Sequence, residues 1–439
     1  MRVTFFGAAS EIGRSCIMLE SNKTRILLDS GVKIGSSEEY PMIPESDLKS
    51  IDAILISHAH LDHSAYLPHI FSKGFRGSVY ATKPTLELMN ILIGDYLKIA
   101  EPPEVDPDAF SKMQKSYKIT EYNMPIIIKD MEISMLPAGH ILGSSMITVK
   151  AEKKSILYTG DVNCRNTKLL NKAESRNLES EIMITESTYG GSKDIFPPEK
   201  SVLAGMISSI KETISKGGKI IIPSFGVGRA QEVMLLLDDY MKSGAIPAVP
   251  IYTDGMVNKA LRIHRHNVIY CRDELQKRIL MNDDDPFKSR NFAEVGGISG
   301  RNKILSQGNP AIIVTTSGML TGGPVLEYLE RLGGDTLNKL ILVGYQAEGT
   351  RGRALAEGAD EIEYKGRKTK ISMDIEQYRL SAHADRNQLL NLIQSVKSMH
   401  DLFIIHGEPS KSRELGEAVS SSGNPARIHI PSIKDSFGF

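Results

Sequence analysis

The 439-residue chain is 41% hydrophobic and 24% charged, a composition typical of globular proteins, and its length favours two domains. Its 53 basic and 53 acidic residues give a formal net charge of zero, which excludes a protein that binds nucleic acid through an overall positive surface. A local basic groove stays compatible with this balance. No apolar run is long enough to cross a bilayer, so we expect no membrane association.

The cysteines and the first residues indicate the compartment. Cys16, Cys164 and Cys271 lie far apart and form no CxxC pair, a usage typical of reduced thiols. The chain starts with a strand-like pattern at 1–6 and not with a signal peptide. We therefore expect a cytoplasmic protein.

The N-terminal part is rich in predicted strands. Residues 2–6, 15–20 and 24–29 are apolar or alternating, and short turns separate them. The third strand ends at Asp29. An Asp at this place can reach a metal, or it can bond to its own backbone in a turn, and the residues alone favour neither.

The most informative stretch is Ser57-His58-Ala59-His60-Leu61-Asp62-His63. It follows the apolar run 53–56, which predicts a buried strand, and precedes 64–68, which predicts the start of a helix. The first two His flank an alanine, so both imidazoles can face one side, while the Asp and the third His can serve a neighbouring position. Imidazole and carboxylate suit zinc, and paired ions are a recurring device for phosphodiester hydrolysis. A polar turn with incidental histidines explains this spacing poorly.

Further candidate ligands follow predicted strands. A helix is predicted at 84–100, and strands at 78–82, 124–128, 131–136, 155–159 and 182–185. His140 lies between glycines after one of these strands. Asp161 ends another, where a carboxylate can bridge two ions, and Glu186 follows the last.

From residue 193 to about residue 370 the pattern changes to strands that alternate with helices. The predicted strands are 219–223, 250–253, 311–316 and 339–345, and the predicted helices are 201–215, 230–241 and 324–332. This alternation predicts a parallel, doubly wound α/β unit.

After residue 370 strand-like sequence and candidate ligands return. His383 precedes a predicted helix at 386–397, and His406 ends the apolar strand that starts at residue 402. Because candidate ligands lie on both sides of the α/β stretch, the simplest account is an insertion into the first domain.

In order and spacing these residues resemble the motifs of the metallo-β-lactamase superfamily and, within it, of the β-CASP nucleases. The four superfamily motifs resemble Asp29, His58 to His63, His140 and Asp161, and the three β-CASP motifs resemble Glu186, His383 and His406. Residues 7–14 and 139–144 add a likeness to archaeal nucleases similar to the endonuclease subunit of the cleavage and polyadenylation specificity factor. The chain resembles their type without KH domains, or a short ribonuclease J-like protein.

The resemblance implies an α/β fold in which an αββα metallo-β-lactamase sandwich carries an inserted, doubly wound β-CASP domain. It implies that the sandwich comprises 1–192 and 371–439, and that the β-CASP domain comprises 193–370.

The resemblance also implies two zinc ions. His58, His60 and His140 resemble the ligands of one ion, Asp62, His63 and His406 those of the other, with Asp161 as the bridge. Asp29 resembles a support that holds the ligands in orientation. Because the DNA-processing branch typically has an apolar residue at the last motif, His406 implies single-stranded RNA as the substrate.

The implied reaction is hydrolysis of RNA that leaves 5′-phosphate and 3′-hydroxyl ends, with Asp62, His383 and Glu186 as catalytic residues. His383 would be the general acid, held by Glu186. The residues alone allow His383 to cap the next helix and Glu186 to face solvent. Endonuclease and 5′-to-3′ exonuclease modes stay open, as do a thioester or lactam hydrolase and a non-catalytic RNA-binding scaffold.

Two loops of the inserted stretch are candidates for binding RNA phosphate. Ser224 and Arg229 lie in a Gly-containing loop before a helix, and Ser317 lies in a second such loop. Arg351 is a further candidate. Tight turns that need glycine explain both loops equally well. Family likeness also implies a homodimer, with 431–439 as the candidate contact.

Overall fold

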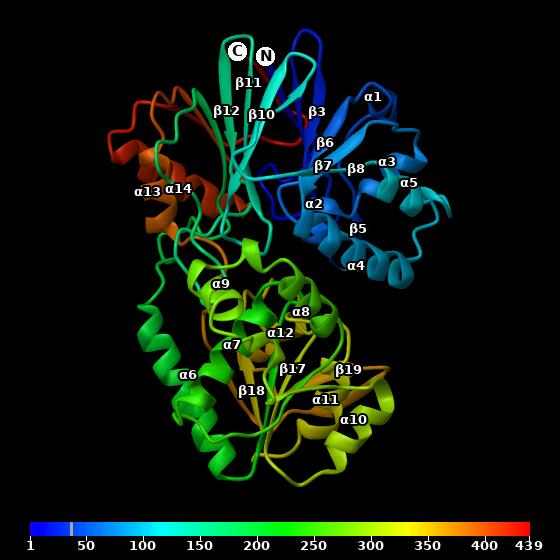
Figure 1. The fold of residues 1–439 in the computed structure, drawn as a ribbon, viewed down its shortest axis with the longest axis vertical. Helices are drawn as coiled ribbons and strands as arrows, with labels where there is room; N and C mark the ends of the chain where they lie inside the picture. The colour runs from blue at the N-terminus through cyan, green and yellow to red at the C-terminus, as the bar shows by residue number, and fades with distance from the viewer. Residues whose placement is uncertain (36–37) are drawn as a thin grey trace. The chain divides into compact units, whose positions relative to one another are not determined.

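The computed structural model describes residues 1–35 and 38–439, which divide into two compact units. Unit 1 comprises Met1–Asn166, Leu170–Ile195 and His383–Phe439, and unit 2 comprises Thr167–Leu169 and Phe196–Ala382 (Figure 1). Each unit has its own sheet system and its own apolar core. None of the described helices is both long enough and apolar enough to cross a membrane.

Unit 1 contains two seven-stranded sheets. The first has the order β24-β1-β2-β3-β6-β7-β8 and the second the order β23-β22-β13-β12-β11-β10-β9. The strands of the first sheet are β1 (Arg2–Phe5), β2 (Ile17–Glu20), β3 (Arg25–Leu28), β6 (Ala53–Leu55), β7 (Ser78–Thr82), β8 (Tyr117–Thr120) and β24 (Ser436–Gly438). Those of the second are β9 (Ile126–Ile128), β10 (Met131–Pro137), β11 (Ser145–Ala151), β12 (Lys154–Tyr158), β13 (Ile182–Glu186), β22 (Asp401–Ile405) and β23 (Arg427–His429). Side chains of both sheets, such as Phe5, Leu28, Ile147 and Phe403, form one core between them.

Helices cover the outer faces of both sheets of unit 1 (Figure 1). They are α1 (Glu45–Leu48), α2 (Leu61–Ser64), α3 (Leu67–Ser72), α4 (Lys83–Ala100), α5 (Ala109–Lys115), α13 (Arg386–Ser395) and α14 (Pro409–Ser421), and a short hairpin is formed by β4 (Lys33–Ile34) and β5 (Glu38–Glu39). On the second sheet, Leu392 of α13 and Leu415 of α14 pack with Met183 and Ile404. The predicted αββα sandwich is therefore confirmed.

Unit 2 is built on a six-stranded parallel sheet with the order β16-β15-β17-β14-β18-β21. The strands are β14 (Lys219–Pro223), β15 (Ile251–Thr253), β16 (Phe292–Glu294), β17 (Ala311–Thr315), β18 (Lys339–Leu342) and β21 (Asp374–Gln377), and a separate hairpin is formed by β19 (Glu361–Tyr364) and β20 (Arg367–Lys370). Every residue of β14 is buried, as expected for a parallel strand that is covered on both faces.

Helices flank both faces of this sheet, so the predicted doubly wound arrangement is confirmed. Ile220 and Ile222 contact the core formed with α6 (Glu199–Ser215) and α7 (Arg229–Lys242). The intervening Ile221 points to the core formed with α10 (Gly297–Ser306), α11 (Val325–Leu332) and α12 (Arg351–Ala356). The unit also contains α8 (Val257–His266), η1 (Val268–Tyr270), α9 (Asp273–Leu280) and η2 (Pro286–Lys288).

The second boundary of the insertion differs from our prediction. The resemblance implies a boundary after residue 370, whereas the chain leaves unit 2 after Ala382. The reason is that β21 pairs in parallel with β18 as an edge strand, and Met373 is buried in the unit 2 core. The sequence predicts a strand here but does not show which sheet it joins.

Candidate metal centre

The metal-type residues of unit 1 lie on loops that follow strands of both sheets. β6 ends at Leu55, and His58 and His60 occupy the loop after it. α2 begins at Leu61, earlier than our predicted start at residue 64, so Asp62 and His63 lie in its first turn. The hydroxyl of Ser64 donates to the carbonyls of Ala59 and His60 and closes the loop onto this turn.

Two glycines allow the ligand loops to approach one another. A Cβ at Gly31 would lie 1.7 Å from the carbonyl oxygen of Asp62. Gly160, which precedes Asp161, has a φ of +52°, and a Cβ there would lie 2.7 Å from Cβ of Ser57. Neither position has room for a side chain, which is why the sequence has Gly beside the motifs.

Three imidazole nitrogens and one carboxylate oxygen converge at a first position. Nδ1 of His60 lies 3.2 Å from Nε2 of His58 and 3.2 Å from Nε2 of His140. Oδ2 of Asp161 lies 3.5 Å from Nε2 of His58 and 3.6 Å from Nε2 of His140. His140 is fixed by its backbone N–H, which donates to Oγ of Ser144 over 3.0 Å.

A second position adjoins the first and uses the other oxygen of Asp161. Oδ1 of Asp161 lies 3.5 Å from Nε2 of His63 and 3.3 Å from Nδ1 of His406. Oδ2 of Asp62 lies 3.4 Å from Nε2 of His406 and 3.9 Å from Nε2 of His63. The two oxygens of Asp161 thus face different ligand sets, as its predicted bridging role requires.

The donor set fits a divalent cation. Zinc–nitrogen bonds of 2.0–2.1 Å in a tetrahedron place neighbouring donors about 3.3 Å apart, close to the spacing at the first position. Among the described residues, Nε2 of His63, Nε2 of His406 and Oδ1 of Asp161 are buried and make no hydrogen bond. Such unsatisfied groups are costly, and a cation between them would satisfy all three.

Electrostatics distinguish the imidazoles. Burial lowers the pKa of His58 well below its usual value and also lowers that of His60, so both are neutral, the form that binds metals. Burial opposes protonation of His63 as well, but the carboxylates of Asp161 and Asp29 raise its pKa to about 10. Cation binding at the second position therefore displaces a proton.

Asp29 supports the ligand loops from the interior. It is fully buried after β3, with a φ of +62°. Its Oδ2 accepts from Nδ1 of His63 over 2.7 Å and from the hydroxyl of Tyr158 over 2.6 Å. Its carboxylate also accepts from the backbone N–H of Ser57. Our sequence analysis missed Ser57 and Tyr158. The place of Ser57 directly before the first His was an available signal, but nothing in the sequence singles out Tyr158.

A sixth imidazole, that of His383, adjoins the cluster. Nδ1 of His383 lies 3.0 and 3.1 Å from the two carboxylate oxygens of Glu186, and its ring centroid lies 4.5 Å from that of His140. The helix-capping alternative is wrong, since Asp385 caps α13. The solvent-facing alternative is also wrong, since Glu186 is 1% exposed and accepts from the N–H of Val162.

Contact between Glu186 and His383 shifts the pKa of each group. Burial by itself would lower the pKa of His383, but Glu186 and Asp161 raise it to about 9. Burial by itself would raise the pKa of Glu186, but His383 lowers it. The pair is thus an imidazolium–carboxylate pair at neutral pH, with a proton available on His383.

The four candidates for RNA phosphate belong to unit 2, where Ser317 and Arg351 make local hydrogen bonds. The hydroxyl of Ser224 is buried and makes no hydrogen bond within the described chain. Ser317 accepts from the N–H groups of Thr321 and Gly322 in its own turn. Arg351 donates to three backbone carbonyls, of Leu320, Thr321 and Glu363, and Arg229 is 8% exposed at the start of α7. Their binding of RNA stays a prediction.

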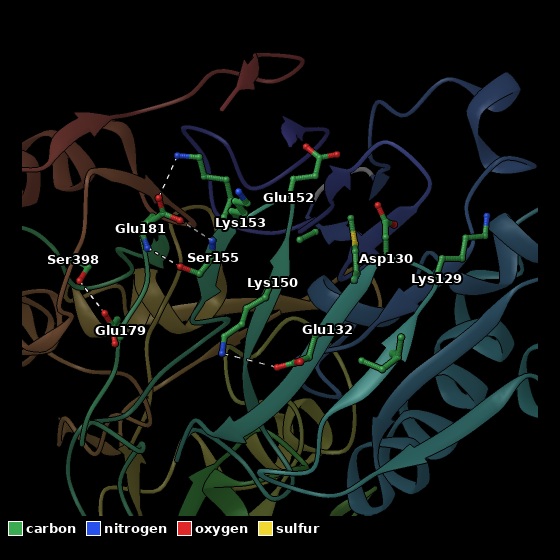
Figure 2. A pocket seen from close by; sticks show the side chains of 14 residues that line it. Lys129, Asp130, Glu132, Lys150, Glu152, Lys153, Ser155, Glu179, Glu181 and Ser398 are labelled. Carbon is green, nitrogen blue, oxygen red and sulfur yellow. Dashed lines mark hydrogen bonds and ion pairs between the residues drawn. The ribbon is translucent and has the colours of Figure 1, made fainter.

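A cavity of about 630 Å³ in unit 1 contains none of the candidate ligands (Figure 2). Some of its charged residues pair with one another, as Lys150 does with Glu132 and Lys154 with Glu181. Across the described chain, groups able to hold a metal occur only among the ligands above and Glu186. Chemistry is therefore expected at the cluster and not in this cavity.

Three family models match the chain. The metallo-β-lactamase superfamily domain matches residues 18–188, the Beta-Casp domain matches 230–355, and the Zn-dependent metallo-hydrolase RNA specificity domain matches 368–431. The first match lies in the first part of unit 1, the second lies in unit 2, and the third spans the end of unit 2 and most of the last part of unit 1.

Two curated relatives from Methanocaldococcus jannaschii illustrate the similarity. The chain is 36% identical to transcription termination factor FttA over 438 residues, which cover 95% of this chain and 69% of that protein. It is 38% identical to an RNase J-like protein over 415 residues, which cover 94% of both chains. A crystal structure of an Enterococcus faecalis protein has the same fold, with a TM-score of 0.60, 14% identity and 99% of both chains covered. The chain belongs to the β-CASP family of the metallo-β-lactamase superfamily.

Proposed function

We propose that the protein is a two-zinc ribonuclease that hydrolyses phosphodiester bonds of single-stranded RNA and leaves 5′-phosphate and 3′-hydroxyl ends. The observation that carries this proposal is the position of Asp161, whose two oxygens face two separate ligand sets beside the His383–Glu186 pair. When bound, a pair of zinc ions acidifies water and offsets the charge that develops on the phosphate.

The protein's own groups have distinct tasks in this reaction. His58, His60 and His140 hold one cation, and His63, His406 and Asp62 hold the other, with Asp161 shared. Asp62 has 33% of its side chain accessible, so its second oxygen is also placed to orient the attacking water.

His383 supplies the proton that the leaving 3′ oxygen needs. It is protonated at neutral pH because of Glu186, and its side chain is 20% exposed, so substrate can reach it. Glu186 accepts from Nδ1 and thereby directs the proton on Nε2 away from itself. The pair has the geometry of a general acid held by a carboxylate.

RNA as the substrate is supported by the match of the RNA specificity domain at 368–431 and by the RNase J-like relative. A thioester or lactam hydrolase of the same superfamily is the alternative, but the inserted unit 2 and the His383–Glu186 pair favour a polymeric phosphodiester. A non-catalytic scaffold is disfavoured because every ligand position is filled.

The test is a time course on one RNA labelled at its 5′ end or at its 3′ end, with and without a chelator. We expect cleavage that stops on chelation and returns with zinc. Products from the interior would indicate endonuclease activity, and mononucleotides released from the 5′ end would indicate the exonuclease mode. Turnover of a thioester panel without RNA cleavage, or undiminished RNA cleavage by Asp62→Ala, would contradict the proposal.

A homodimer and a cytoplasmic location stay separate predictions. The candidate contact 431–439 contains β24, which pairs with β1 and forms one edge of the first sheet. Such an edge strand is available for pairing with a second copy. Light scattering at working concentration should give twice the mass of the 48.4 kDa chain, and the mass of one chain would contradict dimerisation.

A further inference from the structure

The hydrogen bonds around Asp29 determine where several protons lie. Three donors reach its Oδ2, namely the hydroxyl of Ser57 at 2.8 Å, the hydroxyl of Tyr158 at 2.6 Å and Nδ1 of His63 at 2.7 Å. An ionised carboxylate can only accept hydrogen bonds, so each partner must supply a hydrogen. His63 therefore carries a proton on Nδ1, and its Nε2 faces the second cation position.

The hydroxyl of Ser57 has a single hydrogen, and Asp29 receives it. The same oxygen lies 3.1 Å from Nδ1 of His58, so in this contact it must accept. His58 consequently carries its proton on Nδ1 and has its lone pair on Nε2. That is the atom that lies 3.2 Å from Nδ1 of His60 at the first cation position.

We propose that Ser57 is a positioning residue whose hydroxyl links Asp29 to His58 through two hydrogen bonds, a link that we call the relay. One buried carboxylate then sets the tautomer of a ligand at each cation position. His63 is set directly and His58 through the Ser57 hydroxyl. The inference rests on the proposed two-cation site and not on the identity of the substrate. Hydrogen bonds of this kind fix ring orientation and raise ligand basicity.

The surroundings of Ser57 favour a relay of fixed geometry. Ser57 is 1% exposed, so water does not compete for its hydroxyl. A Cβ at Gly160 would lie 2.8 Å from the Ser57 oxygen, so the backbone of the Asp161 loop closes over the hydroxyl. The hydroxyl therefore has few other orientations.

Tyr158 provides a matched control. Its hydroxyl donates to Asp29 and lies 3.1 Å from Oγ of Ser15, and the structure shows no hydrogen bond from it to a ligand. Tyr158→Phe thus removes one hydrogen bond of Asp29 and leaves the relay to His58 intact. Ser57→Ala removes the relay and leaves the bond from His63 to Asp29 intact.

The experiment is a zinc titration of the metal-free protein against a chromophoric chelator. We expect wild type and Tyr158→Phe to bind two ions with similar affinities. Ser57→Ala should bind one ion as wild type does and the other about 10- to 100-fold more weakly. Asp29→Ala should weaken both. Equal binding of both ions by Ser57→Ala and wild type, or equal weakening of both, would overturn the relay.

A second measurement does not depend on metal or activity. Imidazole nitrogen chemical shifts of the metal-free protein should show His58 protonated on Nδ1 in wild type and a mixture of tautomers in Ser57→Ala. A wild-type His58 protonated on Nε2 would overturn the relay, even if the protein folds and cleaves RNA. Failure of the wild type to bind two ions, with the Nδ1 tautomer present, would count against the proposed function and leave the relay supported.

Discussion

The protonation of His383 depends on a balance between burial and charge. Burial alone favours the neutral ring, whereas Glu186 favours the imidazolium and raises the pKa of His383 to about 9. A general acid must be protonated, so activity is expected to fall as pH rises through this pKa. The carboxylate of Glu186, which orients the ring, is therefore also expected to set the highest pH at which the protein is active.

Glu186→Gln tests this balance, because glutamine keeps the shape of the side chain but removes its charge. The pKa of His383 should fall, and the alkaline limb of kcat on RNA should move to lower pH. The measurement is kcat against pH for wild type and variant at saturating zinc. His383→Ala is the control, with kcat lower by about 10²- to 10⁴-fold and no such limb. If the alkaline fall of kcat occurs at the same pH in Glu186→Gln as in wild type, a group other than His383 causes that fall.

At the scale of elements, α13 connects His383, the proposed general acid, to the second sheet. Oδ1 of Asp385 accepts from the backbone N–H of Gln388 over 2.9 Å, and Oε1 of Gln388 accepts from the backbone N–H of Asp385 over 3.3 Å. This capping box fixes the first turn of the helix two residues after His383. The cap should therefore affect both stability and the placement of the acid.

Asp385→Ala should destabilise the protein by about 0.5–2 kcal/mol, the usual cost of losing an N-cap. It should also lower kcat more than it raises KM, because the first turn near His383 loosens while the ligands are unaffected. Denaturant unfolding, steady-state kinetics and bound zinc measure the three effects. Asp385→Asn is the matched variant, since asparagine also caps helices, and it should restore most of the stability. Loss of zinc in Asp385→Ala would contradict the expectation that the cap affects the general acid and leaves the metal ligands unchanged.

Elements with a strong pattern could be predicted from the sequence. The buried run at β14 and the apolar spacing of α4 gave the correct type and nearly the correct bounds. The polar or short elements α5, β16 and α10 were missed, since their burial comes from tertiary packing and not from a local period. The ligand motifs could be recognised because each follows a strand, whereas Tyr158 reaches Asp29 from the other sheet of unit 1, a contact that depends on how the two sheets pack.

At the scale of the whole molecule, candidate ligands from residues 58 to 406 belong to a single unit although the insertion separates them in sequence. The two units have separate apolar cores, so each is expected to unfold in a transition of its own. A ligand that binds only the folded state stabilises the unit that holds it. Metal removal should therefore affect the two transitions unequally.

Calorimetry of the full chain should show two transitions, of which chelation lowers only that of unit 1. Zinc at 1,000 times its dissociation constant stabilises by about 4 kcal/mol per site, and 1 kcal/mol moves the Tm of a domain of this size by about 2–4 °C. We therefore expect a decrease of at least about 10 °C. Ile313→Val, fully buried in unit 2, identifies the other transition, which it should lower by about 1–6 °C because this change costs roughly 0.5–1.5 kcal/mol. Equal shifts of both transitions on chelation would show that the units unfold together, and no shift would contradict a tightly held metal pair.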